Sequence, residues 1–298
     1  MQRALNRDSL DDRIFYFVNY ILLGGILLVT LYPIVFVASA SFSSPNAVST
    51  GRVVLWPVEF SLEGYKAVFK NQSVLTGYYN SFVYTIFGTL INVSLTVLAA
   101  FPLSRKELLG YKQLNFLFAF TMWFSGGLIP TYLLVRQLGL TNTRWALWLP
   151  GAIGVWNVMI TRTFFQNSIP EELYESASID GCGYTRFLWS IAVPLSGAVV
   201  AVISLFYAVA HWNTYFNAFI YLSKEELFPL QLVLRDILLS NKIDASMVMD
   251  ADAQAASADL SDLLKYSLIM VACVPVWCIY PFVQRFFVRG VMLGALKG

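Results

Sequence analysis

Charged residues are scarce in this chain of 298 residues. Asp, Glu, Lys and Arg together make up 13% of the sequence, and 57% of it is hydrophobic, whereas globular proteins average about 25% charged residues. A soluble protein of this size needs more polar surface than 20 basic and 18 acidic residues supply. High hydrophobicity also excludes a disordered chain. We therefore predict an integral membrane protein.

Several classes of chemistry are excluded by what the sequence lacks. The sequence has a single histidine, His211, so it cannot form a His-Glu-x-x-His metal site, and no Ser-His pair of an acyl-transfer triad is apparent. The chain has no Gly-x-x-x-x-Gly-Lys-Ser/Thr phosphate loop, so we expect it to bind no cofactor and to hydrolyse no ATP. Three cysteines form no disulfide framework or metal cluster, and a net charge of +2 gives no reason to expect nucleic acid as a partner.

Long apolar runs are what the sequence does contain. Runs of about 20 apolar residues predict an all-α fold with six transmembrane helices, at Phe15–Ala38, Ser81–Leu103, Asn115–Val135, Leu147–Thr163, Ile191–Tyr215 and Tyr266–Phe286. All charged residues fall at the edges of these spans or between them, as a hydrocarbon core requires. No acidic pair lies inside a span to relay protons, which argues for an external energy source.

The distribution of Lys and Arg predicts the orientation of the chain. With the N-terminus inside, short inner segments carry 11 Lys and Arg, and the longer outer segments carry 9. We therefore expect a cytoplasmic N-terminus over residues 1–14, a six-helix domain over residues 15–286 and a cytoplasmic tail over residues 287–298. Ala38-Ser39-Ala40 resembles a signal-peptide cleavage site. However, the preceding apolar run is longer than a signal requires, so we expect the first span to stay in the membrane.

The inner loop between the fourth and fifth spans predicts a short helix at about 168–181. Ser168 and Glu171 have the spacing of a capping box, Pro170 suits the first turn, and Gly181 or Gly183 provides a stop. Glu171, Glu172 and Glu175 suit the positive end of the helix dipole. Such a helix is too short and too acidic to lie on a membrane surface, and it suits a groove on another protein. An ordinary solvated loop helix is the alternative.

The residues of this loop resemble those of a known family. Glu175-Ser176-Ala177, Gly181 and Ile191-Ala192-Val193-Pro194 resemble the Glu-Ala-Ala signature of ABC importer permeases, in its carbohydrate-uptake branch that includes the maltose system. Val193 stands where the family has leucine, and Ser176 departs from its alanine. Leu103-Ser104-Arg105, the stretch 125–132 and the tail 284–298 are similar to the same branch.

This resemblance implies the fold of a type I ABC importer and a set of partners. It implies a location in the bacterial cytoplasmic membrane. The implied partners are a second homologous permease, two ATP-binding subunits that use ATP and Mg, and an extracytoplasmic solute-binding protein. The implied substrate is a saccharide, specifically an oligosaccharide. The inner loop would be the coupling helix that docks on an ATPase subunit. The residues implied in coupling are Glu171, Glu172, Glu175, Ala177, Asp180, Gly181 and Pro194, and Gly294, Lys297 and Gly298 would reach the ATPase interface.

The end of the fifth span is the candidate substrate path. Tyr207, His211 and Tyr215 recur every four residues, and Asn213 and Asn217 share another face of the same expected helix. Aromatic faces and polar hydrogen-bonding groups suit sugars. These residues could equally belong to an interfacial aromatic belt or to helix–helix contacts. Two other functions stay open at this point, an ABC permease for a non-sugar solute and an ATP-independent channel or facilitator.

Overall fold

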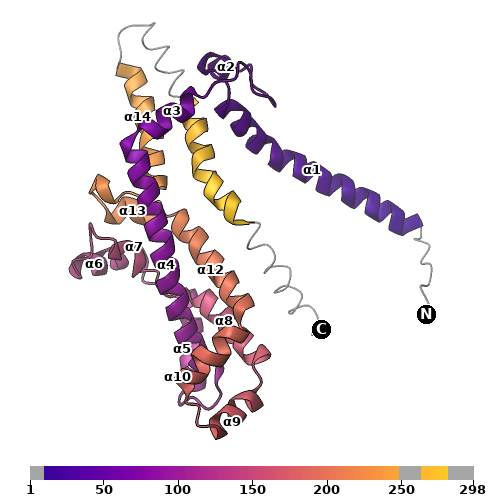
Figure 1. Cartoon of the computed structure of the whole chain (residues 1–298), viewed down its shortest axis with the longest axis vertical. Helices are drawn as coiled ribbons and strands as arrows, with labels where there is room; N and C mark the ends of the chain where they lie inside the picture. The colour runs from indigo at the N-terminus through magenta and orange to yellow at the C-terminus, as the bar shows by residue number, and fades with distance from the viewer. Residues whose placement is uncertain (1–9, 248–262, 281–298) are drawn as a thin grey trace. The chain divides into compact units, whose positions relative to one another are not determined.

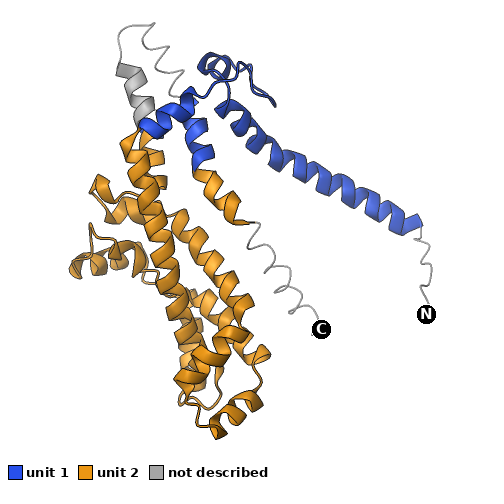
Figure 2. Cartoon of the chain, in the orientation of Figure 1, with its two compact units in different colours: residues 1–70, 238–271 blue, residues 71–237, 272–298 orange. Residues whose placement is uncertain are grey.

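The computed structural model describes residues 10–247 and 263–280, and in these ranges it contains helices and loops but no strand (Figure 1). The chain divides into two compact units, residues 1–70 with 238–271, and residues 71–237 with 272–298 (Figure 2). The described part is therefore all-helical, as the composition predicts.

The first unit begins with a long apolar helix. Helix α1 (Leu10–Ser41) has the length and hydropathy of a membrane span, and α2 (Pro45–Ser49) and α3 (Glu63–Lys70) follow it. Ala40, Ala47 and Val53 form a small core in the loop after α1. Serine hydroxyls satisfy the backbone of this loop, since Ser39 Oγ donates to the Leu55 carbonyl at 2.6 Å. The loop thus has a defined fold of its own.

The second unit is built around α4 (Gln72–Ser104). Asn71 caps this helix, accepting through Oδ1 from the backbone N–H of Ser73 at 2.9 Å. Helix α4 packs against α8 (Val155–Ser168) and α12 (Gly197–Trp212). A buried core joins the three helices, with Phe101, Phe165 and Ile203 among its members. The remaining helices among the described residues are α5 (Tyr111–Trp123), α6 (Leu128–Gln137), α7 (Trp145–Trp148), α9 (Glu171–Ile179), α10 (Tyr184–Phe187), the π-helix η1 (Leu188–Ala192), α11 (Val193–Leu195), α13 (Phe216–Tyr221), the 3-10 helix η2 (Glu225–Leu227), α14 (Leu230–Met247) and the helix Leu263–Tyr280.

Several predicted spans are broken rather than straight. Within the described residues, α1, α4 and Leu263–Tyr280 are long and apolar enough to cross a membrane, and two bent helix pairs raise the number of candidate spans to five. The pairs are α5 with α6, bent by 111°, and Tyr184–Leu195 with α12, bent by 84°. The expected count of six is therefore not reached. Leu147–Thr163 is not one helix, because α7 ends at Trp148 and α8 begins at Val155.

Glycine and proline explain these breaks. Pro150, Gly151 and Gly154 lie in the non-helical segment between α7 and α8. Gly127, with φ of +82°, precedes α6 at the first bend. Backbone that leaves a helix at membrane depth must find partners within the protein. Asn92 Nδ2 accordingly donates to the Gly151 carbonyl at 3.1 Å, so the buried amide of α4 supports the break.

Candidate coupling helix and substrate path

The acidic inner loop forms helix α9, which begins at Glu171 and ends at Ile179. The predicted capping box is wrong. Ser168 is the last residue of α8, and Pro170, which has no side-chain donor or acceptor, is the N-cap of α9. Glu171 and Glu172 lie in the first turn, where the helix dipole favours negative charge.

Gly181 ends this helix in the left-handed conformation. Its φ is +77°, and the Cys182 N–H donates to the Ala177 carbonyl at 2.9 Å while the Gly181 N–H donates to the Ser178 carbonyl at 2.9 Å. This pair of hydrogen bonds is the Schellman motif. Of the two glycines considered from the sequence, Gly181 is therefore the stop. A Cβ atom at this position would meet no neighbouring atom, so the glycine is needed for its backbone conformation.

Helix α9 turns one face to its own protein and the other to solvent. Leu173, Tyr174 and Ala177 pack against the core formed by α4, α8 and α12. Ala177 thus permits close packing within the chain, and its implied role in coupling stays a prediction. The outward stripe of α9, which we define as Glu172, Glu175, Ser176 and Ile179, follows the i, i+3, i+4, i+7 spacing.

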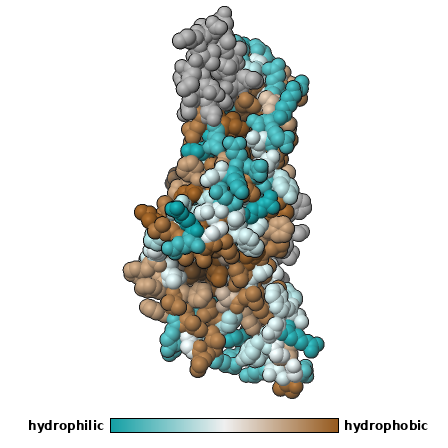
Figure 3. Space-filling view, turned by 90° about the vertical axis from the view of Figure 1, so that its left-hand side faces the viewer, coloured by the Kyte–Doolittle hydropathy of each residue, from teal (hydrophilic) through white to brown (hydrophobic). Residues whose placement is uncertain are grey.

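Ser176 and Ile179 are not among the residues implied in coupling, and Ile179 is the apolar member of the stripe. Its side chain is 87% exposed, at the end of a helix whose other outward residues are polar. Glu171, Glu172, Glu175 and Asp180 are exposed as well, and within the described part of the chain they form no salt bridge. Ile179 is thus a single exposed apolar residue among carboxylates that have no salt-bridge partner in the described ranges. On the face in Figure 3, hydrophobic residues gather over the middle, and the lower end, where α9 lies in Figure 1, shows a mixture of hydrophilic and hydrophobic residues.

The chain continues from α9 to α12 through an irregular helix. Helix α10 passes into the π-helix η1, and Pro194 follows in α11. Proline has no N–H to donate to the preceding turn, so the regular hydrogen-bond ladder cannot pass through it. The 84° bend between Tyr184–Leu195 and α12 comes directly afterwards. Pro194 therefore lies at the bend that connects the segment after α9 to α12.

Two of the candidate substrate-path residues are buried between helices of the second unit. Tyr207 Oη lies 2.7 Å from Thr96 Oγ1 and accepts from the Gly154 N–H at 3.0 Å. It therefore joins α12 to α4 and to the break before α8. His211 is 7% exposed and packs against the backbone of Gly88 in α4. In this conformation both side chains serve helix packing.

The other candidates are exposed where α12 gives way to α13. Helix α12 ends at Trp212 and α13 begins at Phe216, so Tyr215 does not share the helical face of Tyr207 and His211. Asn213 Nδ2 donates to the Val209 carbonyl at 2.8 Å, and the Tyr215 ring stacks on Phe219 at 6.3 Å. Asn217 is exposed on α13. The structure thus separates the five residues into a buried pair and an exposed group of three.

Comparison with known proteins decides the family. No family model matches the chain. It is 39% identical over 290 residues to the polygalacturonan/rhamnogalacturonan transport system permease protein YtcP of Bacillus subtilis strain 168, covering 97% of this chain and 100% of that protein. It is also 37% identical to Protein LplC of the same strain, covering 96% of each chain. The chain belongs to the permease subunits of sugar ABC transporters.

A solved structure supports the same assignment for this permease. The crystal structure of a bacterial ABC transporter involved in the import of the acidic polysaccharide alginate matches it with a TM-score of 0.85 and 34% sequence identity, over 94% of this chain and 99% of that one. The permease is therefore a multi-pass membrane protein with the fold of an ABC importer permease. The tail residues Gly294, Lys297 and Gly298 lie outside the described residues.

Proposed function

We propose that this permease is the transmembrane subunit of an ATP-driven, binding-protein-dependent importer for an oligosaccharide. It would pair with a second homologous permease and two ATP-binding subunits in the bacterial cytoplasmic membrane, with both termini inside, and receive sugar from an extracytoplasmic solute-binding protein. Only the ATP-binding subunits would use ATP and Mg. The observation that carries the proposal is α9, a capped acidic helix that is packed on the core through Leu173, Tyr174 and Ala177 and exposes its outward stripe.

The mechanism follows from how α9 is attached. When two ATPase subunits close on ATP, a helix docked on one of them must move with it. Because α9 packs on the core of α4, α8 and α12, its movement is passed to those helices. Glu172 and Glu175 would offer charge to basic groups of the ATPase, and Ile179 would enter an apolar depression beside them. The bend at Pro194 connects this movement to α12.

The relatives also suggest the charge of the oligosaccharide. YtcP is named for polygalacturonan and rhamnogalacturonan, and the solved transporter for the acidic polysaccharide alginate. Galacturonan and alginate are both polymers of uronic acids. We therefore propose an acidic, uronate-containing oligosaccharide for this permease, in preference to the neutral maltodextrins for which more distant relatives at 24–25% identity are named.

The test is native mass spectrometry of the permease extracted gently from its own membrane, followed by transport into proteoliposomes. A particle with one different permease and two copies of an ATPase supports the importer. The permease alone, or as a homo-oligomer, supports a facilitator and contradicts the proposal. With the complex and its binding protein in hand, uptake of oligogalacturonides but not of maltodextrins supports an acidic substrate. If neither class of oligosaccharide is taken up and a non-sugar solute stimulates ATP hydrolysis, the permease belongs to a non-sugar importer.

A further inference from the structure

A half-buried cation joins α9 to the C-terminal end of α4. Arg105 is the C-cap residue of α4, and its Cζ atom lies over three aromatic rings, at 5.1 Å from the centroid of Phe101 and at 5.4 Å from those of Tyr174 and Phe187. These rings belong to α4, α9 and α10. One guanidinium group thus contacts three helices.

The aromatic rings are the principal partners of this guanidinium. The buried Nε and Nη2 atoms of Arg105 have no hydrogen-bond partner in the described ranges, and no described carboxylate lies within salt-bridge distance. A buried charge without partners is costly, and aromatic faces stabilise a cation most strongly where water is excluded. The guanidinium is planar, so it can stack on rings in a way that a lysine ammonium cannot.

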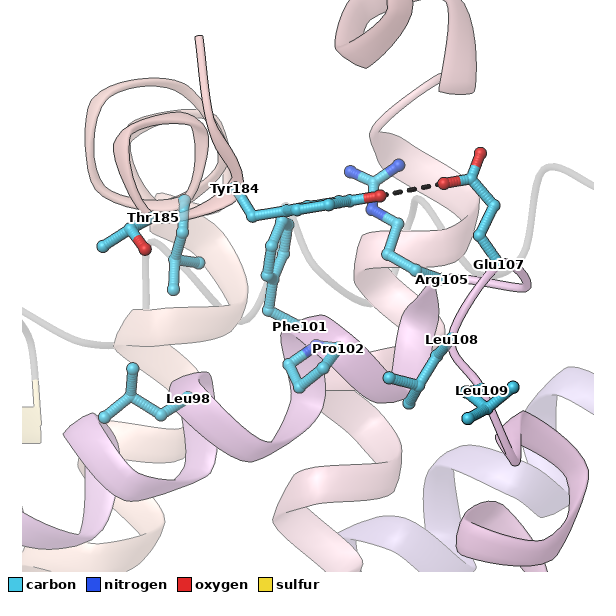
Figure 4. A pocket seen from close by; sticks show the side chains of 10 residues that line it. Leu98, Phe101, Pro102, Arg105, Glu107, Leu108, Leu109, Tyr184 and Thr185 are labelled. Atoms are coloured by element: carbon cyan, nitrogen blue, oxygen red, sulfur yellow. Dashed lines mark hydrogen bonds between the residues drawn. The ribbon is translucent and has the colours of Figure 1, made fainter. Parts of the chain in front are cut away.

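The rings around Arg105 are themselves held in place. Tyr174 packs edge-on against Phe187 at 5.1 Å and stacks on Tyr184 at 4.6 Å. Tyr184 Oη in turn donates to Glu107 Oε2 at 2.9 Å, a bond drawn in Figure 4 beside the Arg105 guanidinium. Glu107 follows Arg105 by two residues in the loop after α4. The contacts of the cluster therefore connect Arg105 at the end of α4 to α9 and α10, and connect α10 back to Glu107 in the loop after α4.

We infer that Arg105 is a positioning residue for coupling: it holds α9 to α4 and α10 so that these elements move together when the ATPase subunits close. The inference rests on the proposed function of α9. The adjoining pocket, a cavity of about 430 Å³ lined by α4, the loop after it and α10, with Leu98, Leu109 and Tyr184 among its residues, leaves room for α10 to shift when the cluster is weakened. Without the cation, movement of α9 would be absorbed by α10 instead of reaching α4.

The test uses the whole complex in proteoliposomes and measures two rates, binding-protein-stimulated ATP hydrolysis and sugar uptake. Arg105→Leu should lower uptake by about tenfold or more while ATP hydrolysis stays within about twofold, because the ATPase still docks. Tyr174→Leu should have the same effect, Tyr174→Phe should behave as the original chain, and Arg105→Lys should fall between. The double variant Arg105→Leu/Tyr174→Leu should be no worse than either single one. Lys106→Leu, which removes an exposed cation from the same loop, is the matched control.

The ratio of sugar transported to ATP hydrolysed separates positioning from general instability. A merely structural role would lower yield and both rates together and leave the ratio unchanged. An unchanged ratio in Arg105→Leu, or in Tyr174→Leu if Arg105→Leu does not assemble, would overturn the inference. If the unaltered permease fails to bind any ATPase, the proposed function itself fails. ATPase binding by the unaltered permease therefore distinguishes failure of the proposed function from failure of the inference about Arg105.

Discussion

The imidazole of His211 in α12 occupies the space that a side chain at Gly88 in α4 would need. A Cβ atom on Gly88 would lie 2.6 Å from Cε1 and 2.7 Å from Cδ2 of His211. The two helices can approach here because one of them has no side chain, as is common where membrane helices pack closely. This contact explains why the only histidine of the chain is buried.

Gly88→Ala should therefore destabilise the permease. Overpacking of a tight interface costs about 1–3 kcal/mol, and thermal unfolding in detergent would report it as a lower midpoint. Gly197→Ala in α12 is the control, because a Cβ atom there meets nothing within 4 Å. His211→Ala should restore much of the loss in the Gly88→Ala background. A change in apparent sugar affinity of His211→Ala with intact assembly would instead assign His211 to the substrate path.

Tyr207→Phe should weaken the packing of α12 against α4. The substitution removes the hydroxyl that pairs with Thr96 and accepts from the Gly154 N–H, and a buried donor left unsatisfied costs about 1–3 kcal/mol. Thermal unfolding should show the loss, whereas Tyr79→Phe, on an exposed ring of α4, should unfold as the original chain does. Equal midpoints for both variants would contradict this role of the hydroxyl.

Gly181→Asp should disable transport and loosen attachment of the ATPase. A residue other than glycine is strained at the φ of +77° found there, and such strain costs about 1–3 kcal/mol. The Schellman end of α9 would be distorted beside the outward stripe. Gly139→Asp is the matched control, since Gly139 also has positive φ, of +67°, and open space around it but lies outside the coupling loop. Co-purification of the ATPase and uptake would be measured for both, and full uptake by Gly181→Asp would refute the prediction.

Ile179→Ser should reduce binding of the ATPase without destabilising the permease. The side chain is 87% exposed, so its removal leaves the core intact but removes apolar area from the proposed docking surface. Burying a side chain of this size contributes about 1.5–3 kcal/mol, which corresponds to a loss of at least about tenfold in affinity. Ser178→Ala, an exposed neighbour, provides the comparison. Equal retention of the ATPase by both variants would remove Ile179 from the docking surface.

Acid should loosen the loop after α1 by protonating Glu59. A hydrogen bond from Ser44 Oγ at 2.6 Å and the Arg52 guanidinium at 2.9 Å lower the pKa of Glu59 below its ordinary value. The pKa of Glu59 is lower in the folded protein than in the unfolded chain. The Glu59 carboxylate therefore stabilises the loop at pH values above its ordinary pKa, and this stabilisation is lost as the pH falls through the lower pKa of the folded protein. Titration of the Glu59 carboxyl carbon by NMR should show a higher pKa for Glu59 in Ser44→Ala than in the original chain. Ser49→Ala, whose hydroxyl contacts only the Asn46 carbonyl, should leave the titration of Glu59 unchanged.

Local sequence determined the membrane class, the all-helical architecture and the position of the acidic helix α9. A hydrocarbon core excludes charge and unpaired backbone groups, so apolar runs predict helices without reference to neighbours. A glycine stop followed from the same local logic, because a Schellman end requires a residue tolerant of positive φ, and the structure selected Gly181 over Gly183. The start of α9 was misplaced because Ser168 can either cap a helix or end one, and the packing of Phe165 and Ile169 into the core selects the second.

Tertiary structure alone decided which faces are buried. The sequence marks Ala177 only as a small residue suited to close contact, and the structure shows that it packs on the core of the same chain. Helical spacing grouped Tyr207, His211 and Tyr215, yet α12 ends before Tyr215, at Trp212. The indole N–H of Trp212 donates to the Ala272 carbonyl at 3.1 Å, a contact with a segment distant in the sequence. The aromatic cluster of Arg105 joins residues from three helices, and no periodicity within one helix can reveal it. Such contacts depend on the approach of segments distant in the chain, which only the folded core brings about.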